Sequence, residues 1–168
     1  MKRSLVCFDS VVKNFSVFAE ASILDNQLML EYWIDGAVGD ILFPQGSKAP
    51  SRKDELWQTT CFEAFWAIAG KKAYWELNLS PSLDWNVYSF SGYRADQKPE
   101  NRIKLEATKL ANRFKTSVDL SKLGLKASEE IDLGLSAVIE TKTVGNTYWA
   151  LTHKGLKPDF HLRKSFIC

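Results

Sequence analysis

The stretch that decides the fold is ELWQTTCFEAFWAIA (residues 55–69), closely followed by AYWELNLSPSLDWNVYSFSGYR (residues 73–94). In the first, Phe62 and Trp66 lie on one side of an extended chain, and Glu63 lies on the other among apolar neighbours. Aromatic residues fit the pleated surface of a sheet. The stretch therefore predicts a β-strand that is buried on both faces, with a carboxylate in a buried or half-buried position.

The same alternation of apolar and polar residues recurs along the chain. In Gln27–Ile34 and Leu133–Glu140 every second residue is apolar, and in Arg113–Leu120 the apolar Phe114, Val118 and Leu120 lie on one side, which is typical of a strand with one buried face. The predicted strands are Leu5–Asp9, Phe15–Leu24, Gln27–Ile34, Thr60–Ile68, Tyr74–Ser80, Trp85–Ser91, Ile103–Leu110, Arg113–Leu120, Leu133–Glu140 and Thr147–Thr152.

Gly, Asn, Asp and Pro residues separate these runs and indicate turns. Only Ser121–Glu130 has a helical character, and Pro44–Glu55 and Arg94–Arg102 are predicted to be surface loops. Many short strands with almost no helix favour an antiparallel sandwich. We therefore expect one all-β domain over residues 1–168: a jelly-roll-like antiparallel β-sandwich of about ten strands with one short helical turn.

Charge and cysteine content exclude several classes of protein. The 168 residues carry 22 Lys and Arg against 20 Asp and Glu, a balance that does not favour nucleic-acid binding. The sequence lacks an apolar run of the roughly 20 residues that span a bilayer and lacks the apolar core of a secretion signal. Cys7, Cys61 and Cys168 form no CxxC motif, which indicates reduced thiols. We expect a cytoplasmic protein without a membrane or nucleic-acid partner.

Polar residues interrupt the aromatic block between Trp57 and Tyr93, which holds four of the six tryptophans and three of the five tyrosines. Glu76 and Asn78 share one face of their strand, and Glu63 lies on the strand before it. Sugar hydroxyls need acids and amides for hydrogen bonds, and the C–H faces of a sugar ring stack on aromatic rings. This pattern points to a carbohydrate or a similar small ligand.

A structural interpretation accounts for the same residues. Glu63 or Glu76 would pair with Arg94 or Arg102, and the tryptophans would fill the core. Burying an ionised carboxylate costs several kcal/mol unless a cation, a donor or a ligand compensates it. Either a partner or a ligand is therefore expected beside Glu63.

The sequence gives less support to a catalytic site than to a sugar-binding site. Glu63, Glu76 and Asp84 are candidates for a glycosidase pair, and Cys61 with His153 for a nucleophile and base, but no catalytic motif supports either set. The absence of such a motif favours a protein without catalytic residues. Cys61 lies on an apolar strand and is predicted to be a buried, inert thiol.

The two histidines belong to the sequence LTHKGLKPDFH, residues 151–161. His153, His161 and Asp159 lack a further ligand at a suggestive spacing, so we predict no metal site and a basic tail folded back onto the sandwich. A haem cofactor would need strong axial ligands, and His153 with Met29 is the one candidate pair. Nothing in the spacing of these two residues singles them out, so haem is disfavoured.

Three phrases of the sequence resemble a known family: ELWQTTCFEAFW, YWELNLSPSLDWNVYSFSGYR and LTHKGLKPDFH. Together they look like the DOMON-like proteins, in particular their cytoplasmic bacterial branch, which is similar to family nine carbohydrate-binding modules. The resemblance spans nearly the whole chain. It implies a β-sandwich of about ten strands, and members of the wider superfamily bind sugars or haem.

The resemblance also implies a ligand site. Trp57 and Trp149 correspond to tryptophans that sandwich a sugar, whereas Glu76 stands where the family has an arginine. The candidate ligand-binding residues are Trp57, Glu63, Glu76, Asn78, Asn146 and Trp149. The expected function is non-catalytic binding of a carbohydrate or sugar-like ligand. A haem-binding electron-transfer domain and a protein interaction module without a pocket stay open as alternatives.

Overall fold

The computed structural model describes residues 2–46 and 49–167, and these residues form two antiparallel sheets. The strands are β1 (Lys2–Ser4), β2 (Val6–Cys7), β3 (Phe15–Leu24), β4 (Gln27–Gly36), β5 (Cys61–Ile68), β6 (Tyr74–Leu79), β7 (Trp85–Phe90), β8 (Lys98–Pro99), β9 (Ala107–Leu110), β10 (Arg113–Asp119), β11 (Ile131–Thr141) and β12 (Gly145–Ala150). Four short 3-10 turns complete the described elements: η1 (Val38–Asp40), η2 (Leu56–Gln58), η3 (Leu120–Leu123) and η4 (Arg163–Ser165).

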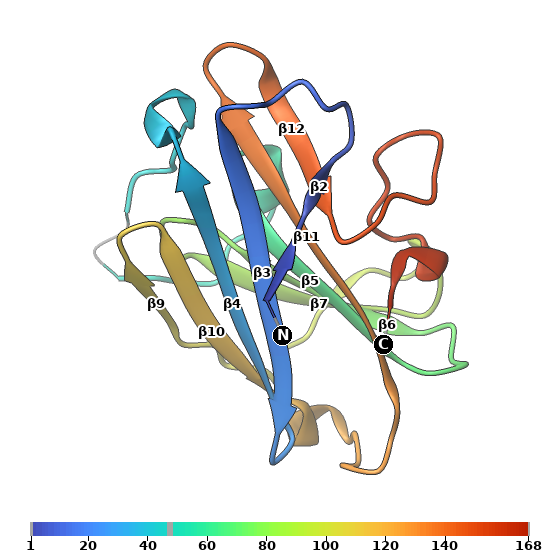
Figure 1. The fold of residues 1–168 in the computed structure, drawn as a ribbon. Coiled ribbons are helices and arrows are strands. Elements are labelled where there is room, and N and C mark those ends of the chain that lie inside the picture. The colour runs from blue at the N-terminus through green and yellow to red at the C-terminus, as the bar shows by residue number, and fades with distance from the viewer. Residues whose placement is uncertain (1, 47–48, 168) are drawn as a thin grey trace.

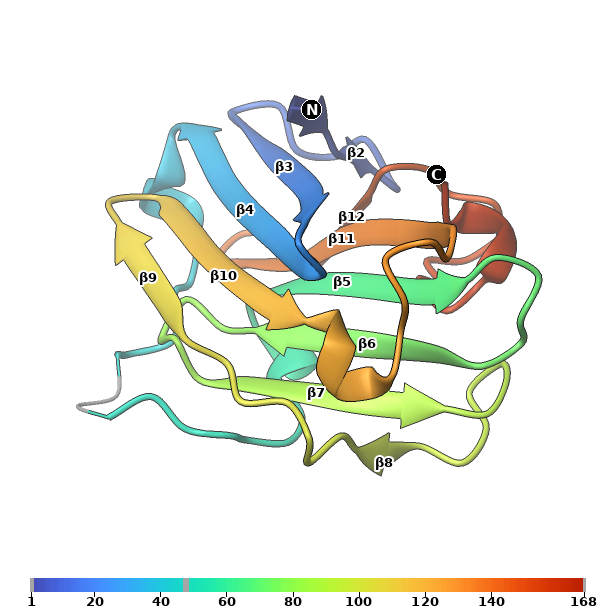
Figure 2. The same ribbon diagram turned by 90° about the horizontal axis from the view of Figure 1, so that it is seen from below.

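The two sheets form the layers of a β-sandwich, as the alternation predicted. One sheet has five strands in the order β1-β3-β4-β10-β9, and the other has seven in the order β2-β12-β11-β5-β6-β7-β8. Figure 1 looks onto the five-stranded sheet, and Figure 2 shows the two layers crossing at an oblique angle. Neighbours such as β4 and β10 are distant in sequence, so the chain passes repeatedly from one sheet to the other.

The main core lies between the sheets and is made of alternate residues of each strand. Phe62, Ala64 and Trp66 point inward from β5 and are fully buried, as their spacing predicted. Tyr32 reaches across from β4, and its hydroxyl donates a hydrogen bond to the Glu63 carbonyl oxygen at 2.6 Å. The position of β5 relative to the opposite sheet is therefore fixed by a polar contact as well as by packing.

A second, smaller apolar cluster covers part of the outer face of the seven-stranded sheet. It contains Phe65 of β5, Tyr74 of β6 and Phe166 near the end of the chain. Gly134 of β11 permits this packing, because a Cβ atom there would lie 3.1 Å from the Phe166 ring. Backbone hydrogen bonds between Leu133 and Ile167 hold the same C-terminal segment. The C-terminal tail does fold back, as predicted, and it covers part of the outer face of the seven-stranded sheet, which contains β5 and β6.

The elements differ from the prediction where strands are very short. The expected strand Leu5–Asp9 is replaced by β1 and β2, which belong to different sheets. The predicted strand Ile103–Leu110 is extended only over Ala107–Leu110, because Ile103 belongs to a loop. β8 lies inside a predicted loop. η3 is the helical turn that was expected near Ser121, whereas the other three 3-10 turns were not predicted.

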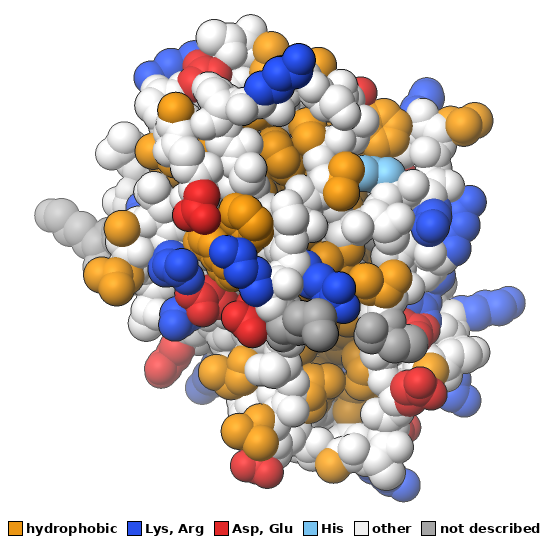
Figure 3. Space-filling view, in the orientation of Figure 1, with side chains coloured by type: hydrophobic (Ala, Val, Ile, Leu, Met, Phe, Trp, Pro, Cys, Tyr) orange, Lys and Arg blue, Asp and Glu red, His pale blue; other side chains and the backbone are white. Residues whose placement is uncertain are grey.

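The outer face of the five-stranded sheet carries aromatic rings that are covered by cations. Phe18 and Trp33 stack at 5.4 Å between ring centroids. The Lys2 ammonium lies over both rings, and the Arg113 guanidinium lies 4.9 Å from the Trp33 ring centroid. Figure 3 shows basic and acidic side chains around apolar atoms on this face. Within residues 2–46 and 49–167, no helix is long and apolar enough to cross a membrane.

Candidate ligand-binding site

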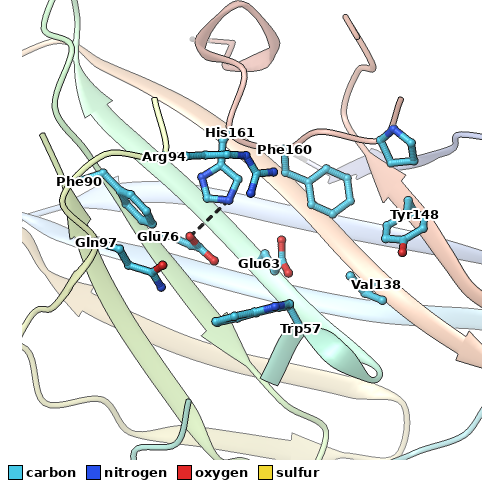
Figure 4. Close-up of a pocket in the computed structure, with 11 residues that line it drawn as sticks. Trp57, Glu63, Glu76, Phe90, Arg94, Gln97, Val138, Tyr148, Phe160 and His161 are labelled. Atoms are coloured by element: carbon cyan, nitrogen blue, oxygen red, sulfur yellow. Dashed lines mark ion pairs between the residues drawn. The ribbon is translucent and has the colours of Figure 1, made fainter. Parts of the chain in front are cut away.

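A pocket opens on the outer face of the seven-stranded sheet, with a cavity volume of about 250 Å³. Its floor comes from β5, β6, β11 and β12, and its walls come from η2, the 91–97 loop and the C-terminal 158–161 segment (Figure 4). The lining residues are Trp57, Glu63, Glu76, Phe90, Arg94, Gln97, Val138, Tyr148, Pro158, Phe160 and His161. Two carboxyl groups on the floor are thus surrounded by aromatic rings.

Glu63 lies on the floor and is 3% exposed, which confirms the buried position predicted for it. Its carboxylate accepts one long hydrogen bond, from the Ser136 hydroxyl at 3.4 Å. Burial in a medium of low dielectric constant and the neighbouring Glu76 carboxylate raise the pKa of Glu63 well above its ordinary value. Glu63 is therefore a poorly compensated acid at the centre of the pocket.

Glu76 lies on the adjacent strand, two residues along the strand from the position paired with Glu63. The Asn78 amide donates a hydrogen bond to its Oε1 atom at 2.7 Å, and Asn78, two residues further along β6, is fully buried. Burial raises the pKa of Glu76 to about 7, although this hydrogen bond and the Arg94 charge act in the opposite direction. Both floor acids are therefore protonated more readily than an ordinary carboxyl group.

His161 stands over these acids from the C-terminal segment. Its Nδ1 atom lies 2.7 Å from the Tyr74 hydroxyl, and its Nε2 atom lies 3.8 Å from the Glu76 Oε2 atom. Burial and the nearby Arg94 charge lower the pKa of His161 to about 4, so the imidazole is neutral at pH 7. His161 thus brings no positive charge to compensate Glu76.

A polar contact at the rim joins the two loops that form the wall. The Arg94 guanidinium lies 3.1 Å from the Asp159 carboxylate, and the Tyr93 hydroxyl donates a hydrogen bond to the same carboxylate. The ion pair expected between a floor acid and Arg94 or Arg102 is replaced by this pair at Arg94 and by a Glu100 pair at Arg102. The floor carboxylates therefore lack a direct arginine partner among the described residues.

Trp57 forms the wall opposite His161 and is only partly buried. It belongs to η2, where Glu55 takes the left-handed conformation at φ 59°. Its ring meets Tyr88 edge-on at 5.9 Å between centroids, and the Tyr88 hydroxyl donates to Asp54. The exposed Asn146 amide donates to the Gln58 carbonyl oxygen at 3.1 Å. Asn146 therefore supports the turn that carries Trp57 and does not line the cavity.

Trp149 does not lie at the pocket, so the expected pair of tryptophans flanking one cleft is wrong. Its ring is 4% exposed, packs against Phe15 in the core at 5.4 Å and donates a hydrogen bond to the Thr147 hydroxyl. Alternate residues of a strand point to opposite faces, so it is Tyr148, one position earlier, that reaches the pocket.

The structure therefore brings Trp57, Glu63 and Glu76 together at the pocket, and Asn78 is hydrogen-bonded to Glu76 without lining the cavity. Several lining residues were missed as site residues: Phe90, Arg94, Gln97, Val138, Tyr148, Pro158, Phe160 and His161. The alternation within β12 was the available signal for Tyr148. The residues from loops carried no such signal, because their placement depends on how the loops fold over the sheet.

The remaining candidate sets are not assembled. Asp84 accepts hydrogen bonds from Ser82 and pairs with Lys53 in a turn outside the pocket. Cys61 is fully buried, and burial raises the pKa of its thiol, while His153 contacts the Val6 carbonyl oxygen. The described residues hold no group of three or more His, Cys, Asp or Glu that could bind a metal ion.

Haem ligation by Met29 and His153 has no support in the geometry. Met29 lines a hollow on the outer face of the five-stranded sheet, whereas His153 packs against Phe8 beside the other sheet. That hollow is larger than the pocket, about 400 Å³, but it is open, and exposed or half-buried side chains such as Lys115 and Glu31 line most of it. We therefore take the pocket with buried polar groups as the candidate site.

Comparison with known proteins gives similarity at the level of structure only. No family model matches the sequence, and no curated protein matches it. Three solved chains match the structure. Two of them are a family 9 carbohydrate-binding module from Caldicellulosiruptor kristjanssonii in complex with cellotriose or with glucose, at 10% and 11% identity and TM-scores of 0.47 and 0.42. The match spans 84% of this chain in both cases, and 68% and 69% of those chains.

The third is a Bacteroides uniformis protein that is provisionally named a carbohydrate-binding protein. It has 11% sequence identity and a TM-score of 0.72, and the match covers 99% of this chain and 84% of that one. At this identity the similarity concerns the path of the backbone and not the ligand. The chain is thus a two-sheet β-sandwich that shares its fold with the Bacteroides uniformis protein.

Proposed function

We propose that the protein binds a carbohydrate in this pocket without transforming it chemically. The observation that carries the proposal is the pairing of two buried acids, Glu63 and Glu76, with the rings of Trp57, Tyr148 and Phe160 around one cavity. Acids accept hydrogen bonds from hydroxyl groups, and aromatic rings receive the C–H faces of a sugar. The cavity volume of about 250 Å³ suits a single ring, since drug-sized ligands take roughly 300–1,000 Å³.

The two acids are poor candidates for glycosidase chemistry. A glycosidase separates the pKa values of its carboxyl groups, so that one is protonated while the other is an ionised nucleophile or base. Here burial raises the pKa of both Glu63 and Glu76, the latter to about 7. The environment therefore disfavours the ionised form of both acids, which supports binding without hydrolysis.

The shapes of the sheet edges support a pocket ligand over a protein docked on an edge. The edge strands β1, β2, β8 and β9 have two to four residues each, which offers few unpaired backbone groups to an incoming strand.

By the resemblance of its three sequence phrases, we assign the chain to the DOMON-like proteins. The two buried and unpaired thiols, Cys7 and Cys61, support a cytoplasmic location.

The test is a titration with neutral monosaccharides and short oligosaccharides, followed by calorimetry and by intrinsic tryptophan fluorescence. We expect saturable binding that Trp57→Ala abolishes, because the ring forms one wall of the cavity. Trp85→Ala is the matched control: Trp85 is also partly buried, but it stacks on Arg52 and does not line the cavity. Equal loss in both variants, or no binding by the wild type, would overturn the proposal.

The absence of catalysis is tested in the same samples. Oligosaccharides incubated with the protein should show no increase in reducing ends over the buffer control. Release of sugar that disappears in Glu63→Gln would show that the acids catalyse hydrolysis and would refute the non-catalytic assignment.

A further inference from the structure

Acidic groups outnumber positively charged groups in the pocket. Among the described residues that line it, two carry carboxyl groups, Glu63 and Glu76, and one carries a guanidinium, Arg94. Arg94 is already paired with Asp159 at the rim, and His161 is neutral at pH 7 because its pKa is about 4. If all the acids ionise, two negative charges remain on the floor.

The floor acids also have unused capacity to accept hydrogen bonds. A carboxylate offers about four acceptor positions. Among the described residues, Glu63 accepts only the 3.4 Å bond from Ser136, and Glu76 accepts only the bond from Asn78. The Glu76 Oε2 atom is 3.8 Å from the nearest imidazole nitrogen, which is beyond a hydrogen bond. A ligand that brings strong donors would satisfy both groups.

Aromatic rings enclose the same space. Trp57 lies on one side of the acids, with Phe160 opposite and Phe90 and Tyr148 toward the two ends (Figure 4). The faces of aromatic rings carry negative charge and attract organic cations, the more strongly when water is excluded. Buried acids within a ring of aromatic side chains form the chemical environment that an alkylammonium group requires.

We infer that the pocket selects a hydroxylated ligand that carries a protonated amino group, such as an amino sugar, over the neutral sugar of the same shape, and that the ammonium group sits between Glu63 and Glu76. The inference rests on the proposed function, since it uses the same cavity. The hydroxyl groups and C–H faces of such a ligand bind as in a neutral sugar. The amino group adds a charge-assisted hydrogen bond, which is roughly twice as strong as a neutral one.

The selection depends on pH through the floor acids. Burial raises the pKa of Glu76 to about 7 and also raises that of Glu63 well above its ordinary value, so an incoming ammonium group favours the ionised acids and displaces protons to solvent. Lowering the pH returns those protons and removes the preference for the cation. Other titratable and charged groups lie near these acids: Tyr32, Cys61, Tyr74, Tyr88, Arg94, Tyr148 and His161.

The experiment compares matched pairs of monosaccharides that differ only by an amino or a hydroxyl group at one carbon. D-glucosamine is titrated against D-glucose, D-galactosamine against D-galactose, and D-mannosamine against D-mannose, at pH 7 and at pH 5. An amine stays protonated over this range, since its pKa is roughly 7.7 or higher. In at least one pair we expect the amino sugar to bind about tenfold more tightly at pH 7, and this ratio to fall toward one at pH 5.

Two variants connect the effect to the acids. Glu76→Gln and Glu63→Gln keep the shape of the side chain and remove the charge, and each should reduce the ratio of amino-sugar to neutral-sugar affinity at pH 7 to less than about threefold. Should one variant fail to fold, the other and the pH dependence of the wild type still decide the question.

The outcomes separate the two proposals. If the neutral member of every pair binds as tightly as the amino member, the inference is wrong and the proposed carbohydrate site stands. If the preference is present but survives both glutamine substitutions, the ammonium group lies elsewhere and the inference is also wrong. If none of the six sugars and none of the neutral oligosaccharides binds, the proposed function itself fails.

Discussion

Replacing Glu76 with glutamine should stabilise the protein at alkaline pH and leave its stability unchanged in mild acid. Burial raises the pKa of Glu76 from 4.5 to about 7 in the folded protein, and the unfolded chain keeps the ordinary value. Between these two values the folded state binds more protons than the unfolded state, so the stability contributed by this group falls as the pH rises. The contribution is complete below pH 4.5 and lost above pH 7.

The magnitude follows from the two pKa values. Each pH unit between them costs about 1.4 kcal/mol, so ionising Glu76 lowers the free energy of unfolding by about 3 kcal/mol above pH 7. Glutamine has no proton to lose and keeps the shape of the side chain. The variant should therefore be more stable than the wild type by about 3 kcal/mol at pH 8 and equally stable at pH 4.5. A smaller residual slope would remain from Glu63, whose pKa burial also raises.

The assay is urea unfolding of both proteins at half-unit steps from pH 4.5 to pH 8.5, with the difference in unfolding free energy plotted against pH. Glu100→Gln is the matched control, because Glu100 is buried as well but the Arg102 guanidinium lowers its pKa. Its replacement should destabilise the protein above pH 4.5. Parallel curves for wild type and Glu76→Gln would show that Glu76 titrates as an exposed acid, which would refute the account of the pocket floor.

Two further predictions concern the core and the wall of the pocket. Trp149→Ala should lower the free energy of unfolding, measured in urea, by about 3–5 kcal/mol, because the Trp149 ring fills the core. Trp57→Ala should change it by less than about 1 kcal/mol. Equal effects of the two substitutions would contradict the assignment of Trp149 to the core and Trp57 to the pocket. Asp159→Asn should weaken the contacts to Tyr93 and Arg94 and speed amide hydrogen exchange in the segment around residue 159, with global stability within about 1 kcal/mol; unchanged exchange would show that another contact holds this wall.

The strands were predictable from the sequence because one physical rule governs them. In β3, β4 and β10 the alternation of apolar residues matches the burial that the sandwich imposes, and β5 is buried on both faces as its composition predicted. The predicted bounds of these four strands agree within two residues. β8 has only two residues, too few for any alternation to be visible. Its pairing depends on the neighbouring strand and not on its own composition.

The site was predictable only in part. Glu63 and Glu76 stood out because a carboxylate in an apolar strand needs a special explanation. Trp149 was misplaced because a resemblance between sequences does not fix which face a strand residue occupies, and a shift of one position exchanges the faces. Arg94 and His161 come from loops, and their approach to the acids follows from the folding of the whole chain over the sheet.

The division of β5 between its two faces restricts how this site can change over evolutionary time. The residues of β5 alternate between the core and the outer face that bears the pocket, so inserting or deleting one residue within the strand would put Glu63 into the core and an apolar ring into the cavity. The length of this strand is therefore fixed by both requirements at once. The 91–97 loop and the 158–161 segment carry no such double requirement. New ligand preferences would arise when these loops change in length or in side chains, while the sheet keeps the spacing of Glu63 and Glu76 constant.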